Sequence, residues 1–484
     1  MTKKAKQIVL DWIEENKKIL IEVHDKIWNL AEVGLQEIHT AKLLTDILEK
    51  EGFKVDHYVA GIPSAFVATY GSGKPAIGIM GELDALPELS QKPLPYREPL
   101  KDGAPGHGCG HHGYATAALG GAIAAKKAME RLGISGTVKY FGCPAEETLV
   151  GKVFMVRDGV FNVDACLGHH PSQFNGANLQ SGNAMNSVKF EFFGVPAHAG
   201  SSPEQGKSAL DAVELMNIGV NYLREHVVQD ARLHYVIEKG GHEPNVVPAY
   251  ARVWYYIRAP TRDLVDQYYE RVLRIADGAD LMADTTHKTR FLTGVHNGMP
   301  NRTLAELIIA NMREIRPPKY IEEELKFAKK LGKTISRQEK IVALRRSGIP
   351  NAMKLVGVDL CTEIFDPWGE SMHGGFSSDV ADVAWNMPTQ EFGTAMFIVG
   401  SPGHSWQNVA SGGMSIGHKS TVFASKVMAT SVIDLLTKPK LLREAKYEWK
   451  ERMKGLVYKS PLLPTLKPPL DQLSFSISEE RTSW

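Results

Sequence analysis

Hydrophobic positions in the first third of the chain follow helical and strand periods in turn. Residues 8–30 and 41–50 place apolar side chains three or four positions apart, which predicts two amphipathic helices. A third helical segment, 115–131, is rich in Ala and Gly. Short apolar runs of strand length lie at 65–70, 76–80, 138–142 and 165–168. Strands alternating with helices predict an α/β domain with a mixed, largely parallel sheet.

From about residue 186 the pattern changes to strands in which polar and apolar residues alternate. Residues 187–193 and 250–257 alternate in this way, as strands do when only one face is buried. Helical spacing follows each of them, at 208–226 and 261–276. This order predicts a small α+β domain inserted into the larger one.

The pattern after this insertion returns to that of the first domain. Helical spacing resumes at Thr303, a core strand is predicted at 395–399, and a long helix is predicted at 420–436. Residues 317–370 are ambiguous: the charged part at 321–333 looks helical, and the rest looks like an excursion from the fold.

The residues beyond Lys438 are charged and then rich in proline, which predicts a tail that wraps the surface. The predicted organisation therefore has four parts along the chain. They are the first part of the larger domain, the inserted domain, the second part of the larger domain and the tail, at 1–185, 186–298, 299–440 and 441–484.

Composition narrows the class of protein. A chain of 484 residues is too long for one ordinary core, which favours two domains. With 43% hydrophobic residues, 23% charged residues and a net charge of +1, we expect a soluble globular protein that binds neither nucleic acid nor membrane. No apolar run approaches the ~20 residues of a membrane helix, and no secretory signal is evident. Four cysteines do not make a disulfide framework, so the predicted location is the cytoplasm.

A thiol and an imidazole stand two positions apart in the glycine-rich stretch 106–112, at Cys109 and His111. Glycine lets the backbone turn tightly enough for both side chains to reach one ion. Cysteine, histidine and carboxylate together form the ligand set that transition metals such as Zn²⁺ bind. Taken alone, the pair favours a buried cysteine beside a structural histidine, so the neighbouring groups decide the interpretation.

Further ligand-type residues each follow a predicted strand: Asp84, Glu146, Glu147, the doublet His169-His170, and His404. Singly, each has a structural alternative, since Asp84 fits a helix cap and two adjacent acids fit a solvated helix start. Open α/β sheets, however, bind ligands at the carboxyl ends of their strands, where all of these residues are expected. One acid can hold a metal while the other stays free to carry a proton. Together they predict a metal-dependent hydrolase.

The motifs around these residues resemble those of the M20 metallopeptidase clan, and within it the amidohydrolase branch. They occur in the family's order between Ala31 and about Leu436: Asp84-Ala85-Leu86-Pro87, Gly106-His107-Gly108-Cys109-Gly110-His111, Pro144-Ala145-Glu146-Glu147, Gly194-Val195-Pro196-Ala197-His198-Ala199-Gly200 and Asn245-Val246-Val247-Pro248. The stretches 402–407 and 417–419 look most like the p-aminobenzoyl-glutamate hydrolase and utilisation group of that branch. The resemblance implies a metallo-exopeptidase-like catalytic domain, with 186–298 as a ferredoxin-like lid and dimerisation domain.

By this resemblance, five residues hold two divalent ions, Zn²⁺ or Mn²⁺: Cys109, His111, Glu147, His170 and His404. Glu146 is the general base, and Asp84 orients a metal-binding imidazole. The chain departs from the family pattern at His112, where many relatives have Asp. In the histidine doublet, His170 is favoured because it immediately precedes Pro171, and His169 stays an alternative.

The resemblance also implies how substrate and partners bind. His198 is expected to reach the active site of a partner subunit, while Asn245 and Arg258 hold the substrate carboxylate, for which the planar fork of arginine is suited. The implied reaction is hydrolysis of an N-acyl amino acid, with p-aminobenzoyl-glutamate foremost, by a homodimer with which a second type of subunit could act. The alternatives are a dipeptidase or general N-acyl-amino-acid deacylase, and a non-catalytic relative that binds peptide or metal. The free acid of the Glu146-Glu147 pair argues against the last.

Overall fold

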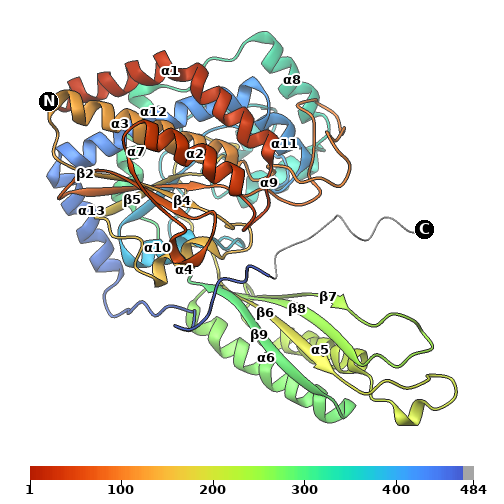
Figure 1. Cartoon of the computed structure of the whole chain (residues 1–484). Coiled ribbons are helices and arrows are strands. Elements are labelled where there is room, and N and C mark those ends of the chain that lie inside the picture. Colours follow the sequence, from red (N-terminus) through yellow and green to blue (C-terminus); the bar gives the residue numbers. More distant parts are fainter. Residues whose placement is uncertain (472–484) are drawn as a thin grey trace.

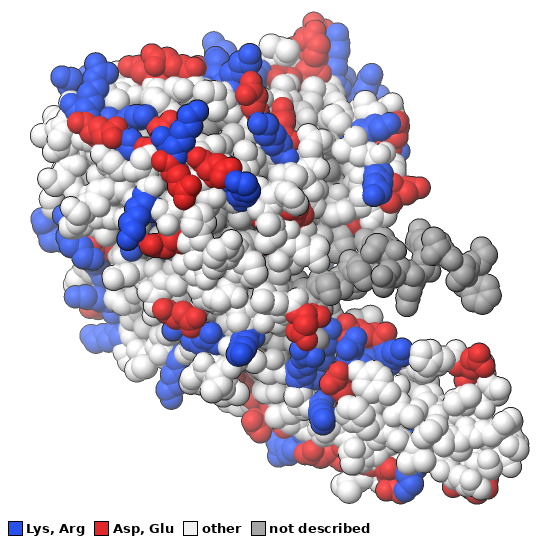
Figure 2. Space-filling model, viewed as in Figure 1, with Lys and Arg blue, Asp and Glu red and all other residues white. Residues whose placement is uncertain are grey.

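The computed structural model describes residues 1–471, and these residues form two bodies (Figure 1). The larger body contains the N-terminal end of this range, and the smaller one projects from it. The C-terminal end reaches the smaller body, where Asp471 pairs with Arg290. Residues 472–484, the end of the predicted tail, lie outside the described residues. Within 1–471 no helix is long and apolar enough to cross a membrane. Positive and negative side chains are intermixed over the face drawn in Figure 2, which agrees with the net charge of +1.

The larger body is built on a mixed sheet. Its strands lie in the order β1-β2-β4-β3-β5-β10. Strands β4, β3, β5 and β10 run parallel, whereas β1 pairs antiparallel with β2 and β2 with β4. The bounds are Lys54–His57 for β1, Phe66–Ser72 for β2, Ala76–Glu82 for β3, Gly136–Cys143 for β4, Ala165–His169 for β5 and Thr389–Phe392 for β10. This architecture confirms the predicted α/β class.

Helices cover both faces of this sheet, because alternate residues of each buried strand point to opposite sides. Ile77 and Ile79 of β3 pack into one core with α1, α2, α3, α7 and α12, while Met80 packs into a second core with α4 and α10 (Figure 1). The bounds are Thr2–Leu30 for α1, Ile38–Lys50 for α2, His111–Leu132 for α3, Gly151–Arg157 for α4, Arg302–Ile315 for α7, Val380–Asn386 for α10 and Ser415–Thr437 for α12. The small residues of α3 permit close packing: a Cβ on Gly121 would lie 2.6 Å from Met428 of α12.

The smaller body is an antiparallel sheet in the order β7-β8-β6-β9, with two helices packed on it. Its strands are β6 Ala184–Phe193, β7 Arg232–Lys239, β8 Tyr250–Ala259 and β9 Thr286–Val295, and its helices are α5 Ala209–Leu223 and α6 Arg262–Ala283. Burial alternates along the whole of β8, which is why its period is visible in the sequence. The edge strands β7 and β9 lack such a pattern, and neither is predicted from sequence.

The remaining α-helices extend the larger body: α8 Glu322–Gly332, α9 Arg337–Arg346, α11 Trp406–Gly412 and α13 Pro439–Arg452. Of the short 3-10 turns, η1 Val59–Gly61 and η4 Ala352–Leu355 also belong to it, whereas η2 Pro203–Gln205 and η3 Arg224–His226 belong to the smaller body. The ambiguous segment 317–370 thus contains two α-helices, and it packs into two small apolar clusters together with residues such as Phe174, Ile398 and Val399. The charged start of the predicted tail is helical in α13, which begins at Pro439, a residue suited to a first helical turn.

The strand predicted at 395–399 is wrong. The last strand of the sheet is β10 at Thr389–Phe392, and 395–399 is buried without forming a strand. The backbone N–H groups of Met396 and Phe397 both donate to the carbonyl of Ser172, so this segment packs against the loop after β5. Within the described residues it forms only one isolated bridge, between Ala395 and Ser172, so its apolar residues reflect burial and His404 does not follow a strand.

Candidate metal centre and pocket

A cavity of about 640 Å³ opens at the carboxyl ends of β4 and β5, where an open α/β sheet is expected to bind ligands. The larger body contributes the candidate ligands Cys109, Glu147, His170 and His404 to its lining, together with Glu146. The smaller body contributes Tyr256 and Arg258 from β8. The cavity is therefore lined by residues of both bodies.

Two groups of potential metal ligands meet at Cys109. The ligand atoms of Cys109, His111 and His170 lie within 4.8 Å of one another, and so do those of Cys109, Glu147 and His404. The Cys109 Sγ lies 3.3 Å from His170 Nε2, and His404 Nε2 lies 3.4 Å from Glu147 Oε2. The structure thus brings all five predicted ligands together, with the thiol common to both groups.

The backbone around Cys109 needs glycine for this arrangement. Gly110 has φ +88°, in the left-handed region, and a Cβ there would lie 2.8 Å from Pro171 and 2.9 Å from Phe397. Helix α3 begins directly after this turn, so His111 occupies its first position.

The histidine doublet divides between two environments. His170 lines the cavity, whereas His169 is fully buried, with its Nε2 2.8 Å from the Thr394 hydroxyl and its ring against Phe392. β5 ends at His169, and His170, the first residue after it, is the one whose side chain reaches the cavity. The departure His112 also points away from the cavity, and its ring packs against His24 and His107.

Asp84 joins the two ligand groups. Its Oδ1 lies 3.0 Å from His111 Nδ1, and its Oδ2 accepts a hydrogen bond of 2.9 Å from the backbone N–H of Glu147. A carboxylate on Nδ1 fixes the orientation of the imidazole, as in the carboxylate–histidine pairs of metal sites.

Three buried charged residues next to this centre are absent from the set predicted from sequence. Glu82 Oε2 lies 3.0 Å from His111 Nε2, and its Oε1 lies 2.8 Å from Lys152 Nζ. Lys152 Nζ also lies 2.6 Å from Asp379 Oδ1, and all three side chains are essentially inaccessible to solvent. One signal in the sequence is an acid, Glu82, at the end of the otherwise apolar run 76–82.

These charges set the electrostatics of the site. Burial raises the pKa of Glu146 well above its usual value, and the carboxylates of Glu82 and Asp379 add to this effect. Burial likewise raises the pKa of Glu147 to about 7. Burial disfavours the charged form of Lys152, but Asp379 and Glu82 outweigh this and hold its pKa well above the ordinary value. Glu146 Oε2 lies 3.9 Å from His111 Nε2, so an acid with a high proton affinity stands beside the candidate ligands.

The three predicted substrate-binding residues are not brought together. The Nε of Arg258 is buried and has no hydrogen-bond partner within residues 1–471, and the side chain lines the cavity. His198 and Asn245 are exposed on the smaller body and do not line the cavity of the same chain. The Nδ1 of His198 accepts hydrogen bonds of 3.1 Å from the backbone of Gly200 and Ser201.

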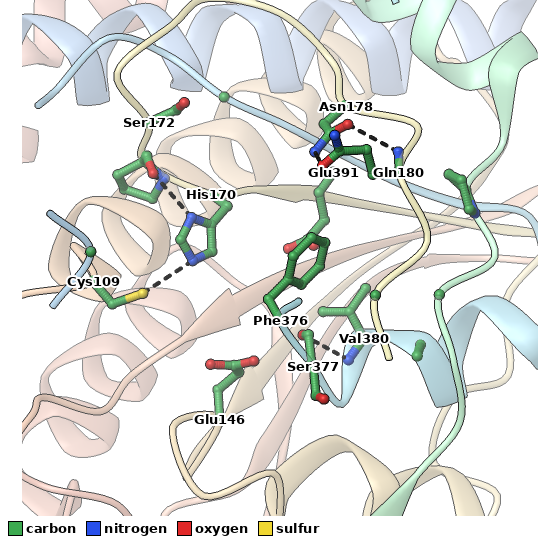
Figure 3. Close-up of a pocket in the computed structure, with 18 of the residues that line it drawn as sticks. Cys109, Glu146, His170, Ser172, Asn178, Gln180, Phe376, Ser377, Val380 and Glu391 are labelled. Carbon is green, nitrogen blue, oxygen red and sulfur yellow. Dashed lines mark hydrogen bonds between the residues drawn. The ribbon is translucent and has the colours of Figure 1, made fainter. Parts of the chain in front are cut away.

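The wall of the cavity away from Cys109 comes from the loop after β5, from the segment that precedes α10, and from β10. It carries both aromatic and polar side chains: Phe174, Asn178, Gln180, Trp368, Phe376, Ser377, Gln390 and Glu391. Figure 3 shows Cys109 on one side of His170, and Phe376, Asn178, Gln180 and Glu391 on the other.

Comparisons with known proteins show which family this chain resembles. Residues 78–467 match the model of Peptidase family M20/M25/M40. The chain is 39% identical over 468 residues, 95% of its length, to one of the subunits of the p-aminobenzoyl-glutamate hydrolase of Escherichia coli K12, of which the match covers 97%. Among solved structures, an aminobenzoyl-glutamate utilization protein from Klebsiella pneumoniae has a TM-score of 0.56 at 16% identity, covering 88% of this chain and 97% of that one. The Bacillus subtilis YXEP protein, a dinuclear metal binding peptidase of the M20 family, has a TM-score of 0.53 at 17% identity, covering 87% and 99%.

An α/β sheet whose strand ends gather cysteine, histidine and paired acids is the architecture of a hydrolase. The chain belongs to Peptidase family M20/M25/M40, because the family model matches most of its length. This confirms the family predicted from the motifs, and it makes the protein an enzyme that hydrolyses amide bonds.

Proposed function

We propose that this protein is a two-metal amidohydrolase that cleaves N-acyl amino acids, with p-aminobenzoyl-glutamate as its principal substrate. The observation that carries the proposal is the pair of ligand groups that share Cys109, with Glu146 beside them as an additional carboxylate. The substrate follows from the 39% identity, over almost the whole chain, to the hydrolase subunit of Escherichia coli.

The donor set fits two divalent ions. Glu147 Oε1 is a buried polar atom that makes no hydrogen bond within residues 1–471, and an ion at its ligand group would satisfy it. Cys109, His111 and His170 would hold one ion, and Cys109, Glu147 and His404 the other. Such an ion, Zn²⁺ or Mn²⁺, polarises an amide carbonyl and lowers the pKa of water.

The chain's own residues divide the remaining work. Glu146 takes a proton from the attacking water and returns one to the leaving amine, a role that its raised pKa suits. Asp84 fixes the orientation of His111 and the backbone of Glu147. Arg258 binds the carboxylate of the amino acid through its guanidinium, whose Nε has no hydrogen-bond partner within residues 1–471.

We propose further that the enzyme is a cytoplasmic homodimer and that a second type of subunit takes part. His198 and Asn245 are exposed and lie outside their own chain's cavity, so they would act on the substrate in a partner's site. The edge strand β7, with exposed Val236 and Ile237, offers a surface for pairing. Residues 1–185 and 299–440 would form the catalytic domain, and 186–298 the lid. Cys109, Cys143, Cys166 and Cys361 are free thiols, which suits a reducing compartment.

The test is a panel of amides incubated with metal-loaded protein. Release of glutamate mainly from p-aminobenzoyl-glutamate supports the proposal. Equal release from aliphatic N-acyl amino acids or dipeptides would contradict the substrate and favour a general deacylase or dipeptidase. No release from any amide, in the presence of two bound ions, would contradict catalysis altogether.

Replacing Cys109 with Ala should lower the metal content of the purified protein from two ions to one or none. The thiol belongs to both ligand groups, so its loss weakens both sites. Elemental analysis after dialysis measures the content. Cys361→Ala, a free cysteine in a separate apolar cluster, is the matched control and should keep two ions. Full retention by Cys109→Ala would remove the thiol from the proposed ligands.

A further inference from the structure

The proposed mechanism does not use one carboxylate of the cavity, that of Glu391. It belongs to β10, where Thr389, Gln390 and Phe392 are buried and Glu391 alone keeps partial exposure. Because Glu391 lines the cavity, this exposure is to the cavity. Within residues 1–471, none of the groups of metal-ligand type includes Glu391.

Tyr114 holds this carboxylate in place. Its hydroxyl donates a hydrogen bond of 2.7 Å to Glu391 Oε1, and its ring lies edge-on to the rings of His111 and His170, at 6.4 and 6.2 Å between centroids. The contact crosses the sheet above Gly168, where a Cβ would lie 2.2 Å from the tyrosine oxygen and 3.0 Å from Glu391 Cγ. A glycine at this point of β5 is therefore required for the pair to meet.

The second oxygen of Glu391 is an acceptor open to a ligand, since only Tyr114 bonds to the carboxylate within residues 1–471. Two neighbouring amides already have hydrogen-bond partners within the protein. Asn178 donates to Gln180 Oε1 and accepts from its backbone N–H, while Gln390 donates to backbone carbonyls and accepts from the N–H of Asn301. Burial, with the nearby Glu82, raises the pKa of Glu391 to about 7.

The cavity around Glu391 suits an aromatic ring. Phe174, Trp368 and Phe376 contribute aromatic surface to its lining, and Arg258 lies on the smaller body's side. A planar acyl group bound by its carbonyl at the metal centre would extend along these rings and present its far substituent to an acceptor. A benzoyl group with a hydrogen-bond donor at the para position matches this arrangement.

Resting on the proposed function, we propose that Glu391, positioned by Tyr114, determines acyl specificity by accepting a hydrogen bond from the arylamine of an aminobenzoyl substrate. An amine at the para position of the benzoyl ring donates a charge-assisted hydrogen bond to the carboxylate of Glu391. A methyl group of the same size at that position leaves the carboxylate oxygen unpaired.

The measurement is the ratio of kcat/KM for p-aminobenzoyl-glutamate to that for p-methylbenzoyl-glutamate. We expect a preference of about ten- to hundredfold for the amine in the unmodified enzyme, the range of one hydrogen bond to a charged group. In Glu391→Gln the amide oxygen can accept from Tyr114, which turns an NH₂ donor to the ligand. The ratio should then fall toward one, and p-nitrobenzoyl-glutamate, whose para group is an acceptor, should gain relative to the amine.

Two controls separate this effect from damage to the site. Elemental analysis should find the same metal content in Glu391→Gln as in the unmodified enzyme. Glu363→Gln changes an exposed glutamate of the same region, paired with Lys354 and outside the cavity lining, and should leave the ratio as it was. Tyr114→Phe removes only the positioning hydroxyl, so its ratio should lie between those of the unmodified enzyme and Glu391→Gln.

A binding assay keeps this inference separate from the proposed function. Calorimetry on the metal-loaded protein compares p-aminobenzoate with p-methylbenzoate and needs no turnover. If neither acyl-glutamate is cleaved, the proposed substrate fails, yet preferential binding of p-aminobenzoate that is lost in Glu391→Gln still supports the role of Glu391. Equal affinities in the unmodified protein, or a preference unchanged in a folded Glu391→Gln variant, would overturn it. Should that variant not fold, the comparison on the unmodified protein decides.

Discussion

Glu146→Gln should lose about 10²- to 10⁴-fold in kcat while keeping its bound metal, the span usual for general acid–base catalysis. Glutamine has nearly the same shape but cannot take a proton from water or return one to the leaving amine. Glu146 is not part of either ligand group that contains Cys109, so the ions should remain. Initial rates on p-aminobenzoyl-glutamate, together with elemental analysis of the same sample, measure both expectations.

Two control variants are needed to interpret this result. Glu130→Gln, on the exposed side of α3, should have ordinary activity and ordinary metal content. Glu147→Gln should lose metal as well as activity, because Glu147 belongs to a ligand group. Activity in a metal-replete Glu146→Gln protein within a few fold of the unmodified enzyme would refute its role as the general base.

Lys152→Met should lower the free energy of unfolding by about 3–5 kcal/mol, the usual cost of removing one partner of a buried ion pair. The ammonium lies between Glu82 and Asp379, and neither carboxylate has access to water. Without it, two negative charges remain in the core beside His111. Urea unfolding of the apo protein measures the loss apart from any effect on the ions. The deficit should widen as the pH rises, because the unpaired carboxylates can be neutralised by protons only at lower pH.

Lys126→Met is the matched control for this prediction. Lys126 is also nearly buried, but its partner Glu130 is 43% exposed, so the change should cost no more than about 1 kcal/mol. Adding Asp379→Asn to Lys152→Met should cost less than the sum of the single changes, because it removes one of the stranded charges. Equal losses for Lys152→Met and Lys126→Met would show that the charge cluster is not a stabilising unit.

The period of hydrophobic residues predicts an element well where burial is one-sided or complete over its whole length. Strand β3 is buried throughout and β8 alternates without a break, and both are found where the sequence predicts them. The edge strand β7 is largely solvated, and β9 changes from exposed to buried along its length, so neither strand carries one clear period. At 395–399 the error is the reverse, because a strand is predicted where none forms. These residues are apolar since they are buried against the loop that contains Ser172.

In the candidate site, too, some residues could be predicted from the sequence and others could not. Cys109, Glu147 and His404 are recognisable because few structural roles need those side chains in those motifs. In the sequence Glu82 and Lys152 look like any other charged residues. Their importance becomes visible only in the structure, where Lys152 forms buried ion pairs with Glu82 and Asp379. Glu391 likewise has no distinguishing feature in the sequence, and only the hydrogen bond from Tyr114 and its place in the cavity lining identify it as a candidate functional residue.

By itself, the amino-acid sequence determined the family, the α/β class and the types of ligand atom at the centre, because these depend on motifs and on local periodicity. Only the tertiary structure decided that His170 rather than His169 faces the cavity, that Cys109 joins two ligand groups, and that His198 lies outside its own chain's cavity. Those outcomes depend on where a strand ends and on contacts between residues hundreds of positions apart. Local sequence carries no direct record of either.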